Sequence, residues 1–283
     1  MRETELKEMS ITTSTKSGMM ENEVPLDLSK NGLSPQSSSS AEQTQKSISS
    51  IEKKNFSDEK NNFSNPWDLN FWNSSDWEKI NARLDYLERI GRSISPSRDE
   101  MFTSLERTER NQVRVCVVGQ DPYPNKAYAT GVAFSVPQTV LPKDFPVTLK
   151  SIFSEYCSDL SLPYPTMGDL SRWTDQGVLL WNAIPSTTAG ESLAHDWREY
   201  DNLTLEVLNI LDGRGVVFAF LGAVPRRYAG SIRSAGSRVI ECSHPSPRGS
   251  LSSRNPFRGS RLFSKINYLL REIGQPPIDW RLP

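Results

Sequence analysis

The stretch VRVCVVGQDPYP at residues 113–124 decides the fold of this chain. Its first six residues are rich in valine, which predicts a strand buried on both faces, as in a parallel sheet. Gly119 lets the backbone turn, and Pro122 and Pro124 stiffen the loop that follows. We therefore expect Asp121 on a rigid loop at the carboxyl end of a core strand, where open α/β sheets bind their ligands.

Helical stretches separate this strand from three others. The predicted strands are 113–118, 178–183, 215–221 and 237–242. The predicted helices are 147–158, 167–176, 200–211, 225–235 and 263–274. Strands that alternate with helices favour a mostly parallel sheet with helices on both faces. We expect an α/β fold, with three αβα layers around a central, mostly parallel sheet of four strands.

The chain has two regions of different composition. Residues 1–65 are rich in Ser, Thr, Asn, Lys and Glu, as in SPQSSSSAEQTQKSISS at 34–50, and contain no Trp or Tyr. Such a segment buries too little apolar surface to offset the entropy lost on ordering. We expect a disordered polar extension over residues 1–65, which could tether partner proteins, followed by one α/β domain over residues 66–283.

Cysteine usage and hydropathy indicate the compartment. Cys116, Cys157 and Cys242 are few, odd in number and far apart, which favours buried or free thiols in a reducing compartment over a disulfide framework or a metal site. No apolar run approaches the roughly 20 residues that span a membrane, and the N-terminus lacks a hydrophobic signal core. We expect an intracellular protein, neither secreted nor in a membrane: cytoplasmic in a bacterium, nuclear in a eukaryote or for a virus.

The net charge of −1 conceals a strongly basic segment. Between residues 225 and 271 a single acid, Glu241, accompanies these basic residues: Arg226, Arg227, Arg233, Arg238, Arg248, Arg254, Arg258, Arg261, Lys265 and Arg271. Scattered charges usually form a solvated surface, but these are concentrated, of one sign, and interspersed with Gly, Ser and Pro. The pattern favours a polyanionic partner, most simply the phosphates of a nucleic acid.

Polar or aromatic residues stand at or just after the carboxyl end of the predicted strands. Asp121 and Tyr123 follow the first strand, Asn182 ends the second, and His244 follows the fourth. Because the carboxyl ends of parallel strands share one edge of a sheet, we expect these four side chains to meet in one crevice. A His in a Pro-stiffened loop beside an Asp, an Asn and an aromatic residue is a good candidate for catalysis.

Two of these strand ends and one further segment resemble motifs of the family-1 uracil-DNA glycosylases. GQDPY at 119–123 is similar to the water-activating loop of that family. GVAFSV at 131–136 is similar to the segment whose Phe stacks on the base, and LLWNA at 179–183 to the strand that carries the uracil-reading Asn.

The C-terminal part of the chain extends the resemblance. HPSP at 244–247 and FRGSRLFSKIN at 257–267 are similar to the DNA-intercalation loop and its exit helix, and PIDW at 277–280 to the C-terminus of the family. The resemblance covers roughly residues 101–283, and several separate motifs occur in the right order. It identifies residues 66–283 as a uracil-DNA glycosylase catalytic domain.

The resemblance implies hydrolysis of the N-glycosidic bond of deoxyuridine in DNA, which releases uracil, leaves an abasic site and starts base-excision repair. Uracil in a duplex is buried by stacking, so the nucleotide has to be flipped into a pocket. Phe134 would stack on the flipped base, Asn182 would pair with its O4 and N3–H, and the Gln120 main-chain N–H would hold O2. Tyr123 would stand against C5 and exclude the methyl group of thymine.

The resemblance also implies which residues break the bond. Asp121 would orient the attacking water and stabilise the cationic sugar, and His244, as a neutral imidazole, would donate a hydrogen bond to O2 of the departing uracil anion. No metal or organic cofactor is needed. Three scattered cysteines cannot supply the four ligands of an iron–sulfur cluster, which some relatives carry.

DNA contacts are expected from loops of small residues whose amides and hydroxyls reach phosphates. By resemblance, the DNA-binding residues are Pro146, Thr148, Gly222, Ala223, Ser246, Arg248, Leu251 and Phe257. Leu251 is the first candidate for the apolar wedge that enters the base stack, and Phe257 is the second.

Three departures from the family pattern concern the grip on DNA. Pro124 stands where many members have a His that contacts a phosphate, and Ala223 stands where a Ser would offer a hydroxyl. Arg248 stands where a Leu wedge usually follows HPSP, in a loop that is longer than usual. These changes leave the base-reading and water-activating residues intact.

The resemblance thus predicts a monomeric glycosylase that acts on uracil in single- or double-stranded DNA and that a DNA-mimicking inhibitor protein could bind. Two alternatives stay open. One is an enzyme of the same superfamily that acts on mismatched thymine or another damaged base, which Tyr123 opposes. The other is a DNA-binding or replication-accessory protein without chemistry, which the intact Asp121, Asn182 and His244 oppose.

Overall fold

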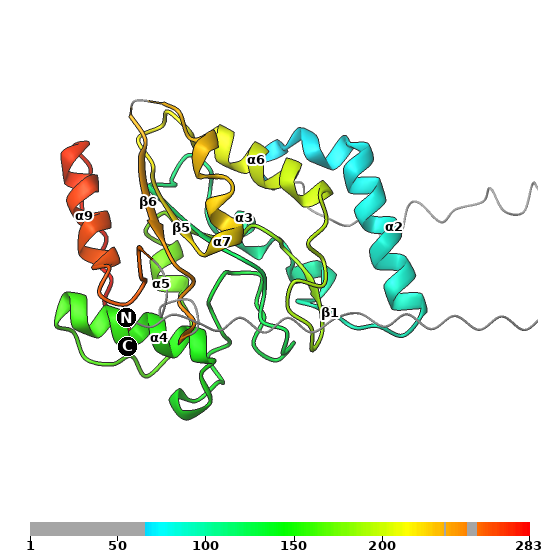
Figure 1. Cartoon of the computed structure of the whole chain (residues 1–283), viewed down its shortest axis with the longest axis horizontal. Coiled ribbons are helices and arrows are strands. Elements are labelled where there is room, and N and C mark those ends of the chain that lie inside the picture. The colour runs from blue at the N-terminus through cyan, green and yellow to red at the C-terminus, as the bar shows by residue number, and fades with distance from the viewer. Residues whose placement is uncertain (1–65, 235, 248–253) are drawn as a thin grey trace, which may run out of the picture. The chain divides into compact units, whose positions relative to one another are not determined.

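The computed structural model of the chain describes residues 66–234, 236–247 and 254–283 (Figure 1). The polar extension predicted over residues 1–65 lies outside these ranges, as do Arg248 and Leu251. Within the described ranges, none of the helices combines the length and the apolar character that crossing a membrane requires.

The central sheet consists of β2 (Val115–Gly119), β3 (Val178–Asn182), β5 (Val217–Leu221) and β6 (Arg238–Cys242). The strands are ordered β3–β2–β5–β6 and run parallel throughout. Because β2, β3 and β5 are buried on both faces, their sequences are continuously apolar, whereas the edge strand β6 is partly exposed. The predicted α/β fold with a four-stranded parallel sheet is confirmed.

The strand order determines where a crevice can open. From β2 the chain adds β3 on one side and later β5 on the other, so the loops after β2 and β5 leave in opposite directions. Open α/β sheets bind ligands at such a switch point. The segments that follow Gly119 and Leu221 therefore border the expected site.

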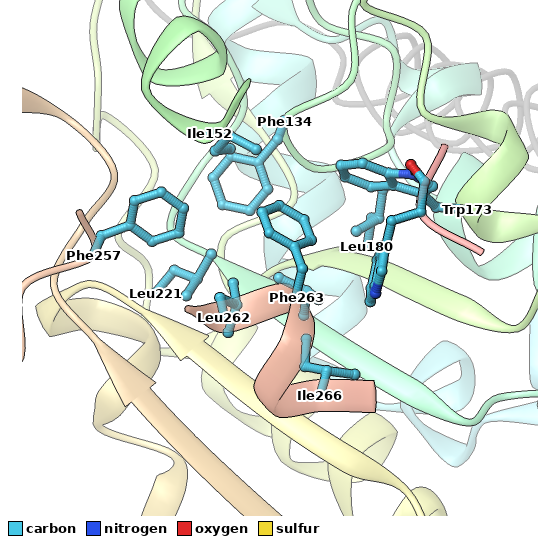
Figure 2. Close-up of a pocket in the computed structure, with 11 residues that line it drawn as sticks. Phe134, Ile152, Trp173, Leu180, Leu221, Phe257, Leu262, Phe263 and Ile266 are labelled. Atoms are coloured by element: carbon cyan, nitrogen blue, oxygen red, sulfur yellow. The ribbon is translucent and has the colours of Figure 1, made fainter. Parts of the chain in front are cut away.

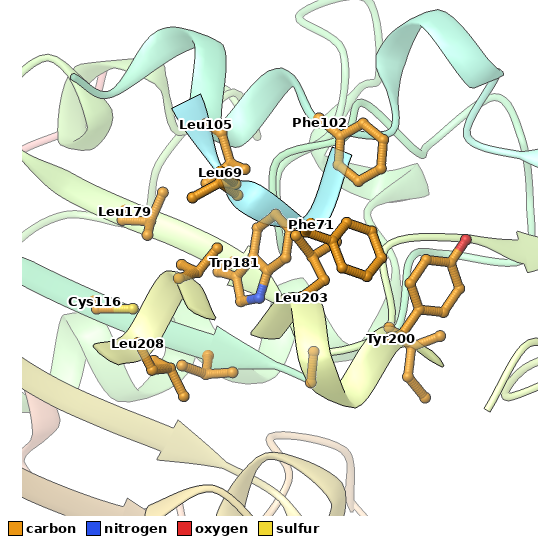
Figure 3. Close-up of a cluster of buried hydrophobic side chains, with 14 of the residues drawn as sticks. Leu69, Phe71, Phe102, Leu105, Cys116, Leu179, Trp181, Tyr200, Leu203 and Leu208 are labelled. Carbon is orange, nitrogen blue, oxygen red and sulfur yellow. The ribbon is translucent and has the colours of Figure 1, made fainter. Parts of the chain in front are cut away.

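One face of the sheet is covered by α2 (Ser75–Arg89), α3 (Thr103–Arg107), α6 (Glu199–Leu211) and α7 (Ala223–Arg226) (Figure 1). Alternate strand residues such as Cys116, Trp181 and Phe218 pack against them, because side chains along a strand point to opposite faces in turn. Figure 3 shows Trp181 in this cluster, between Leu69 and Leu203.

The other face is covered by α4 (Val147–Leu160), α5 (Ser171–Thr174) and α9 (Leu262–Glu272), which pack on Val117, Leu180 and Ala219. In Figure 1, α4 and α9 lie on the opposite side of the sheet from α2 and α6. The three αβα layers are thus present.

Helix predictions differ from the structure mainly in extent. Within 167–176, α5 occupies only residues 171–174, and the expected helix over 225–235 is replaced by the end of α7 and the 3₁₀ turn η5 (Ala229–Ser231). The sequence did not predict α2, whose N-cap Ser74 accepts a hydrogen bond from Trp77 N–H at 3.3 Å.

Short elements complete the described chain. β1 (Ile94–Ser95) and β4 (Thr187–Thr188) form an antiparallel pair. The remaining 3₁₀ turns are η1 (Pro66–Asp68), η2 (Asn70–Asn73), η3 (Arg98–Glu100) and η4 (Pro142–Asp144).

Candidate active site

Gly119 ends β2 where two of the predicted side chains meet. It pairs in register with Asn182, the last residue of β3. A Cβ atom at position 119 would lie 2.8 Å from Cζ of Phe134 and 2.9 Å from Oδ1 of Asn182, closer than van der Waals contact allows. Glycine is required by this close approach, and Phe134 and Asn182 lie together over the end of β2.

Main-chain hydrogen bonds fix Phe134 in an unusual backbone conformation. Its φ of 68° is left-handed, which is strained for a bulky residue. The Tyr123 hydroxyl donates to the Phe134 carbonyl at 2.9 Å, and the adjacent Ala133 N–H donates to the Leu180 carbonyl at 3.0 Å. The aromatic ring is thereby held over the strand end, with 9% of the residue exposed.

Tyr123 is anchored at both ends. Besides the bond from its hydroxyl, its carbonyl accepts a hydrogen bond from Ser95 Oγ at 2.8 Å, and its ring meets Tyr128 edge-on at 6.3 Å between centroids. Burial raises the pKa of Tyr123, so the hydroxyl stays protonated and remains a donor. The phenol ring is therefore a rigid wall of the site.

The Asp121 carboxylate has donors at both oxygens. Gln120 Nε2 donates to Oδ1 at 2.9 Å. Ser192 Oγ and Leu193 N–H both donate to Oδ2, at 2.8 Å and 2.6 Å. Three hydrogen bonds fix the plane of the carboxylate. Oδ2 already accepts two of them, whereas Oδ1 accepts one and keeps a lone pair for a further partner such as water.

His244 is held as a neutral imidazole with a defined proton position. The Ser246 N–H donates to Nδ1 at 3.1 Å, so Nδ1 is an acceptor and a neutral ring carries its proton on Nε2. Burial lowers the pKa of His244, although the negative charge of Asp121 opposes this shift. Within the part of the chain that the structure describes, no hydrogen bond occupies Nε2, so this N–H is available to a ligand.

Gly222 brings the ends of β5 and β6 together beside this histidine. Its φ of 117° suits only glycine, and a Cβ atom there would lie 3.3 Å from Cβ of His244. Its N–H also donates to the Cys242 carbonyl at 3.0 Å. The imidazole therefore packs directly on the backbone of Gly222.

Two contacts and one electrostatic effect connect the predicted residues at one edge of the sheet. Tyr123 bonds to Phe134, Phe134 meets Asn182 over Gly119, and the charge of Asp121 acts on the His244 imidazole. The arrangement offers an aromatic face, an amide with a donor and an acceptor, an oriented carboxylate and a neutral N–H donor.

The predicted phosphate-contacting residues lie at two helix starts and beside His244. Pro146 and Thr148 flank the first residue of α4, where helical N–H groups lack intrahelical partners. Gly222 is buried and Ala223 is exposed at the start of α7, and Ser246 is half-buried. Arg248 and Leu251 lie outside the described residues, so the first candidate for the wedge has no structural description.

The prediction that Phe257 acts as a DNA wedge is wrong. The residue is 1% exposed and lines a small apolar pocket with Phe134, Leu221 and Phe263 (Figure 2). Its N–H donates to Ser243 Oγ at 3.0 Å, which fixes the backbone as well. The side chain fills the core beneath Phe134 and is not available to enter a base stack.

Sequence reasoning did not find two of the residues that contact Asp121. Ser192 is one hydroxyl in an exposed loop, and Leu193 contributes its main-chain N–H, which every residue except proline has. No pattern of residue types marks such a donor. Only the folded loop places it against the carboxylate.

The basic segment supplies exposed positive charge to the surface of the domain. Most of its described members are exposed: Arg227, Arg233, Arg254, Arg258, Arg261, Lys265 and Arg271. Two of them have acidic partners, Arg227 with Asp196 at 3.4 Å and Arg261 with Asp159 at 3.6 Å. Exposed cations of this kind attract a polyanion without specifying its sequence.

Known proteins resemble this chain over most of the described domain. A family model described as the uracil DNA glycosylase superfamily matches residues 107–271. The uracil-DNA glycosylase of Ruegeria sp. (strain TM1040) is 38% identical over 207 residues, which cover 73% of this chain and 85% of that protein. The uracil-DNA glycosylase of Parafrankia sp. (strain EAN1pec) is 38% identical over 211 residues, covering 73% of this chain and 90% of its own length.

Solved structures show the same fold. A crystal structure of a mimivirus UNG variant in complex with UGI has a TM-score of 0.69 at 24% sequence identity. The match covers 78% of this chain and 89% of the mimivirus chain.

Proposed function

Because this chain belongs to the uracil-DNA glycosylase superfamily, we propose that its strand-end crevice excises uracil from DNA by hydrolysing the N-glycosidic bond of deoxyuridine. The products are free uracil and an abasic site, the starting point of base-excision repair. One observation carries the residue assignment: the Asp121 carboxylate, the Asn182 amide and the neutral His244 imidazole converge on one sheet edge beside Phe134.

Base recognition is assigned to Asn182, Phe134 and Gln120. An amide presents both a donor and an acceptor, so Asn182 matches the O4 acceptor and N3–H donor of uracil and mismatches the amino group of cytosine. The fixed ring of Phe134 provides a stacking face for the flipped base. The Gln120 main-chain N–H assists at O2, while its side chain donates to Asp121.

Selection against thymine is assigned to Tyr123. Its ring is anchored through Phe134 and Ser95 and so cannot yield easily to a methyl group at C5. A hydrophobic pocket discriminates weakly between bases that differ by one methyl group, but a rigid clash adds a repulsive element. This anchoring favours uracil over the alternative of a mismatched-thymine substrate.

Bond cleavage is assigned to His244 and Asp121. As the bond lengthens, negative charge grows on uracil O2 and positive charge on the sugar. The Nε2–H of a neutral His244 donates to O2, and the oriented Asp121 carboxylate positions water and stabilises the cationic sugar. Both groups need little rearrangement when charge develops in the transition state, because hydrogen bonds already hold them in place.

DNA binding is assigned to the loop backbones and the basic segment. The N–H groups around Thr148 at the start of α4, the Gly222–Ala223 turn and the Ser246 hydroxyl are suited to phosphates. Leu251 and Arg248 remain assigned to the wedge loop by resemblance, and the exposed arginines supply non-specific affinity.

Partners and compartment follow from the same assignment. We propose that the chain acts as a monomer on single- or double-stranded DNA, inside the cell. Support for a reducing compartment comes from Cys116, Cys157 and Cys242, which are free thiols. The UGI complex of the mimivirus protein supports an inhibitor of that kind as a further ligand.

The decisive experiment is uracil release from an oligonucleotide with one deoxyuridine, followed by alkaline strand cleavage. The wild-type chain should release uracil and leave thymine and mismatched thymine untouched. Asp121→Asn and His244→Ala should each lower the single-turnover rate by about two orders of magnitude or more. Binding without release by the folded wild type would instead indicate a DNA-binding protein without chemistry, and near-normal rates of a variant would refute that residue's role.

A further inference from the structure

His195, the other of the two histidines of the chain, lies outside the crevice, yet both its ring nitrogens have hydrogen-bond partners. It is 1% exposed. Its Nδ1 is 2.9 Å from Ser186 Oγ, and its Nε2 is 3.1 Å from Thr188 Oγ1. Its ring also stacks on Trp197, with centroids 4.2 Å apart and planes at 17°. Through these contacts, the buried imidazole holds the segments of Ser186, Thr188 and Trp197 in place.

The hydrogen bonds of His195 connect to the helical layer. Ser186 Oγ lies 2.7 Å from the Tyr200 hydroxyl in α6. On the Trp197 ring, the Arg83 guanidinium of α2 lies 5.2 Å from the centroid. His195 is thus held by elements that are parts of the packed core and not by the loop alone.

The segment between Thr188 and His195 is a closed turn that reaches Asp121. Thr187 Oγ1 donates to the Glu191 carbonyl at 2.5 Å and accepts from Ala194 N–H at 3.3 Å. At its tip, Ser192 Oγ and Leu193 N–H donate to Asp121 Oδ2. Leu193 has a left-handed φ of 60°, so the turn holds a residue in a conformation that it would not adopt readily by itself.

We propose that His195 is a positioning residue for the reaction: by joining Ser186 and Thr188 it fixes the turn whose Ser192 and Leu193 donors orient the Asp121 carboxylate toward the attacking water. The proposal rests on the proposed role of Asp121. In the absence of His195 the two donors would lose their fixed place, and Oδ2 could rotate toward solvent. Misplacement of a reacting group by about 1 Å can cost roughly two orders of magnitude in rate.

Histidine suits this place because it bridges two hydroxyls while staying uncharged. Burial lowers the pKa of His195 to about 4, so the ring is neutral at pH 7 and has one donor and one acceptor. Each hydroxyl partner can take the complementary role. A neutral His195 ring adds no positive charge that would compete with the sugar cation for Asp121.

Three substitutions separate positioning from simple packing. His195→Phe keeps a ring for stacking on Trp197 and loses both hydrogen bonds, and His195→Gln restores one donor and one acceptor. Ser192→Ala removes one donor to Asp121 at an exposed position, where folding is not at risk. Thr174→Val is the matched control, because Thr174 is 2% exposed, donates one hydrogen bond to the Ser171 carbonyl at 2.8 Å, and lies in α5 on the other face of the sheet.

The measurements are the single-turnover rate and KM on uracil-containing DNA, alone and with Asp121→Asn. We expect His195→Phe to lower the rate about 10-fold or more with little change in KM, His195→Gln to recover part of it, and Ser192→Ala to lose a smaller factor. In the Asp121→Asn background, His195→Phe should have almost no further effect, because the group it orients is gone. Thr174→Val should keep the wild-type rate.

Each contrary result has a distinct meaning. An equal loss from His195→Phe with and without Asp121→Asn would show a merely structural role and overturn the proposal. A normal rate for Ser192→Ala together with a normal rate for His195→Phe would do the same. A normal rate for Asp121→Asn itself would instead refute the proposed function of Asp121, so the two failures are distinguishable.

Discussion

Gly119 shows how tightly the proposed base site is packed at a single residue. Phe134 and Asn182 occupy the space that any side chain at position 119 would need. We expect Gly119→Ala to push both groups away from the strand end and to lower the rate of uracil release by about 100-fold. Because the added methyl group overpacks the site in this variant, its free energy of unfolding should also fall, by about 1–3 kcal/mol. Single-turnover kinetics and urea unfolding measure the two effects.

The control for this substitution is Gly230→Ala. A Cβ atom at position 230 would meet nothing within 4 Å, and its φ is not left-handed. This variant should keep the wild-type rate. A Gly119→Ala protein that excises uracil normally would show that Phe134 and Asn182 do not need the positions described.

Two substitutions can separate the proposed steric role of Tyr123 from its hydrogen bond to Phe134. Tyr123→Ala removes the ring, so we expect the variant to release thymine from ordinary DNA in addition to uracil, at a reduced overall rate. Tyr123→Phe keeps the ring and loses only the hydrogen bond to the Phe134 carbonyl. Release of labelled thymine is the measurement. If Tyr123→Phe released thymine as readily as Tyr123→Ala, the ring itself would not be the filter.

Among the helices, α4 anchors the segment that leads out of the His244 loop. Glu155 is 3% exposed and accepts from Gly259 N–H at 2.5 Å and Arg261 N–H at 2.7 Å. One turn later, Asp159 accepts from Ser264 N–H at 2.8 Å. The two carboxylates therefore fasten the start of α9 to α4 through backbone donors.

Removal of the first of these acceptors should destabilise the domain. Glu155→Ala leaves two backbone N–H groups without their partner, so we expect the free energy of unfolding to fall by about 1–3 kcal/mol or more. Glu155→Gln keeps one acceptor oxygen of similar reach and should lose less. Chemical denaturation measures both, and an Ala variant as stable as wild type would mean that α4 does not fasten this segment.

In the molecule as a whole, the sheet could be predicted from sequence and much of its surroundings could not. β2, β3 and β5 are buried on both faces, so their continuous apolar runs are a local signal. α2 has no such signal, because only Ile80 and Leu84 are buried in its 15 residues. The position of α2 depends on packing against α6 and η2, and the residue pattern of α2 alone does not indicate these contacts.

The candidate site likewise has parts that could be predicted from sequence and parts that could not. Residues that have a side-chain role in the proposed reaction, such as Asp121, Asn182 and His244, stand in motifs that sequence reasoning found. Leu193 acts through its main chain, which no residue type signals. The burial of Phe257 was not predicted because it depends on packing with Phe134 and Leu221, which are distant in sequence.

The two histidines make the stability of the whole domain depend on pH. Burial lowers the pKa of His195 from 6.5 to about 4 and lowers that of His244 as well. Between pH 6.5 and about pH 4, His195 binds a proton in the unfolded chain but not in the folded chain, so acidification favours unfolding. The stabilisation is complete above about pH 6.5 and declines toward pH 4. Below that, carboxyl groups with lowered pKa, such as Asp169 and Asp212, contribute further losses.

We expect the free energy of unfolding to fall by about 2 kcal/mol between pH 7.5 and pH 5 from His195 alone. Urea unfolding at the two pH values measures this difference. In His195→Phe the titrating ring is absent, so the variant should be less stable at pH 7.5 but should lose much less on acidification, the remainder coming from His244. Parallel pH dependence in wild type and His195→Phe would contradict a neutral, buried His195, because the slope reports only groups whose proton binding changes on unfolding.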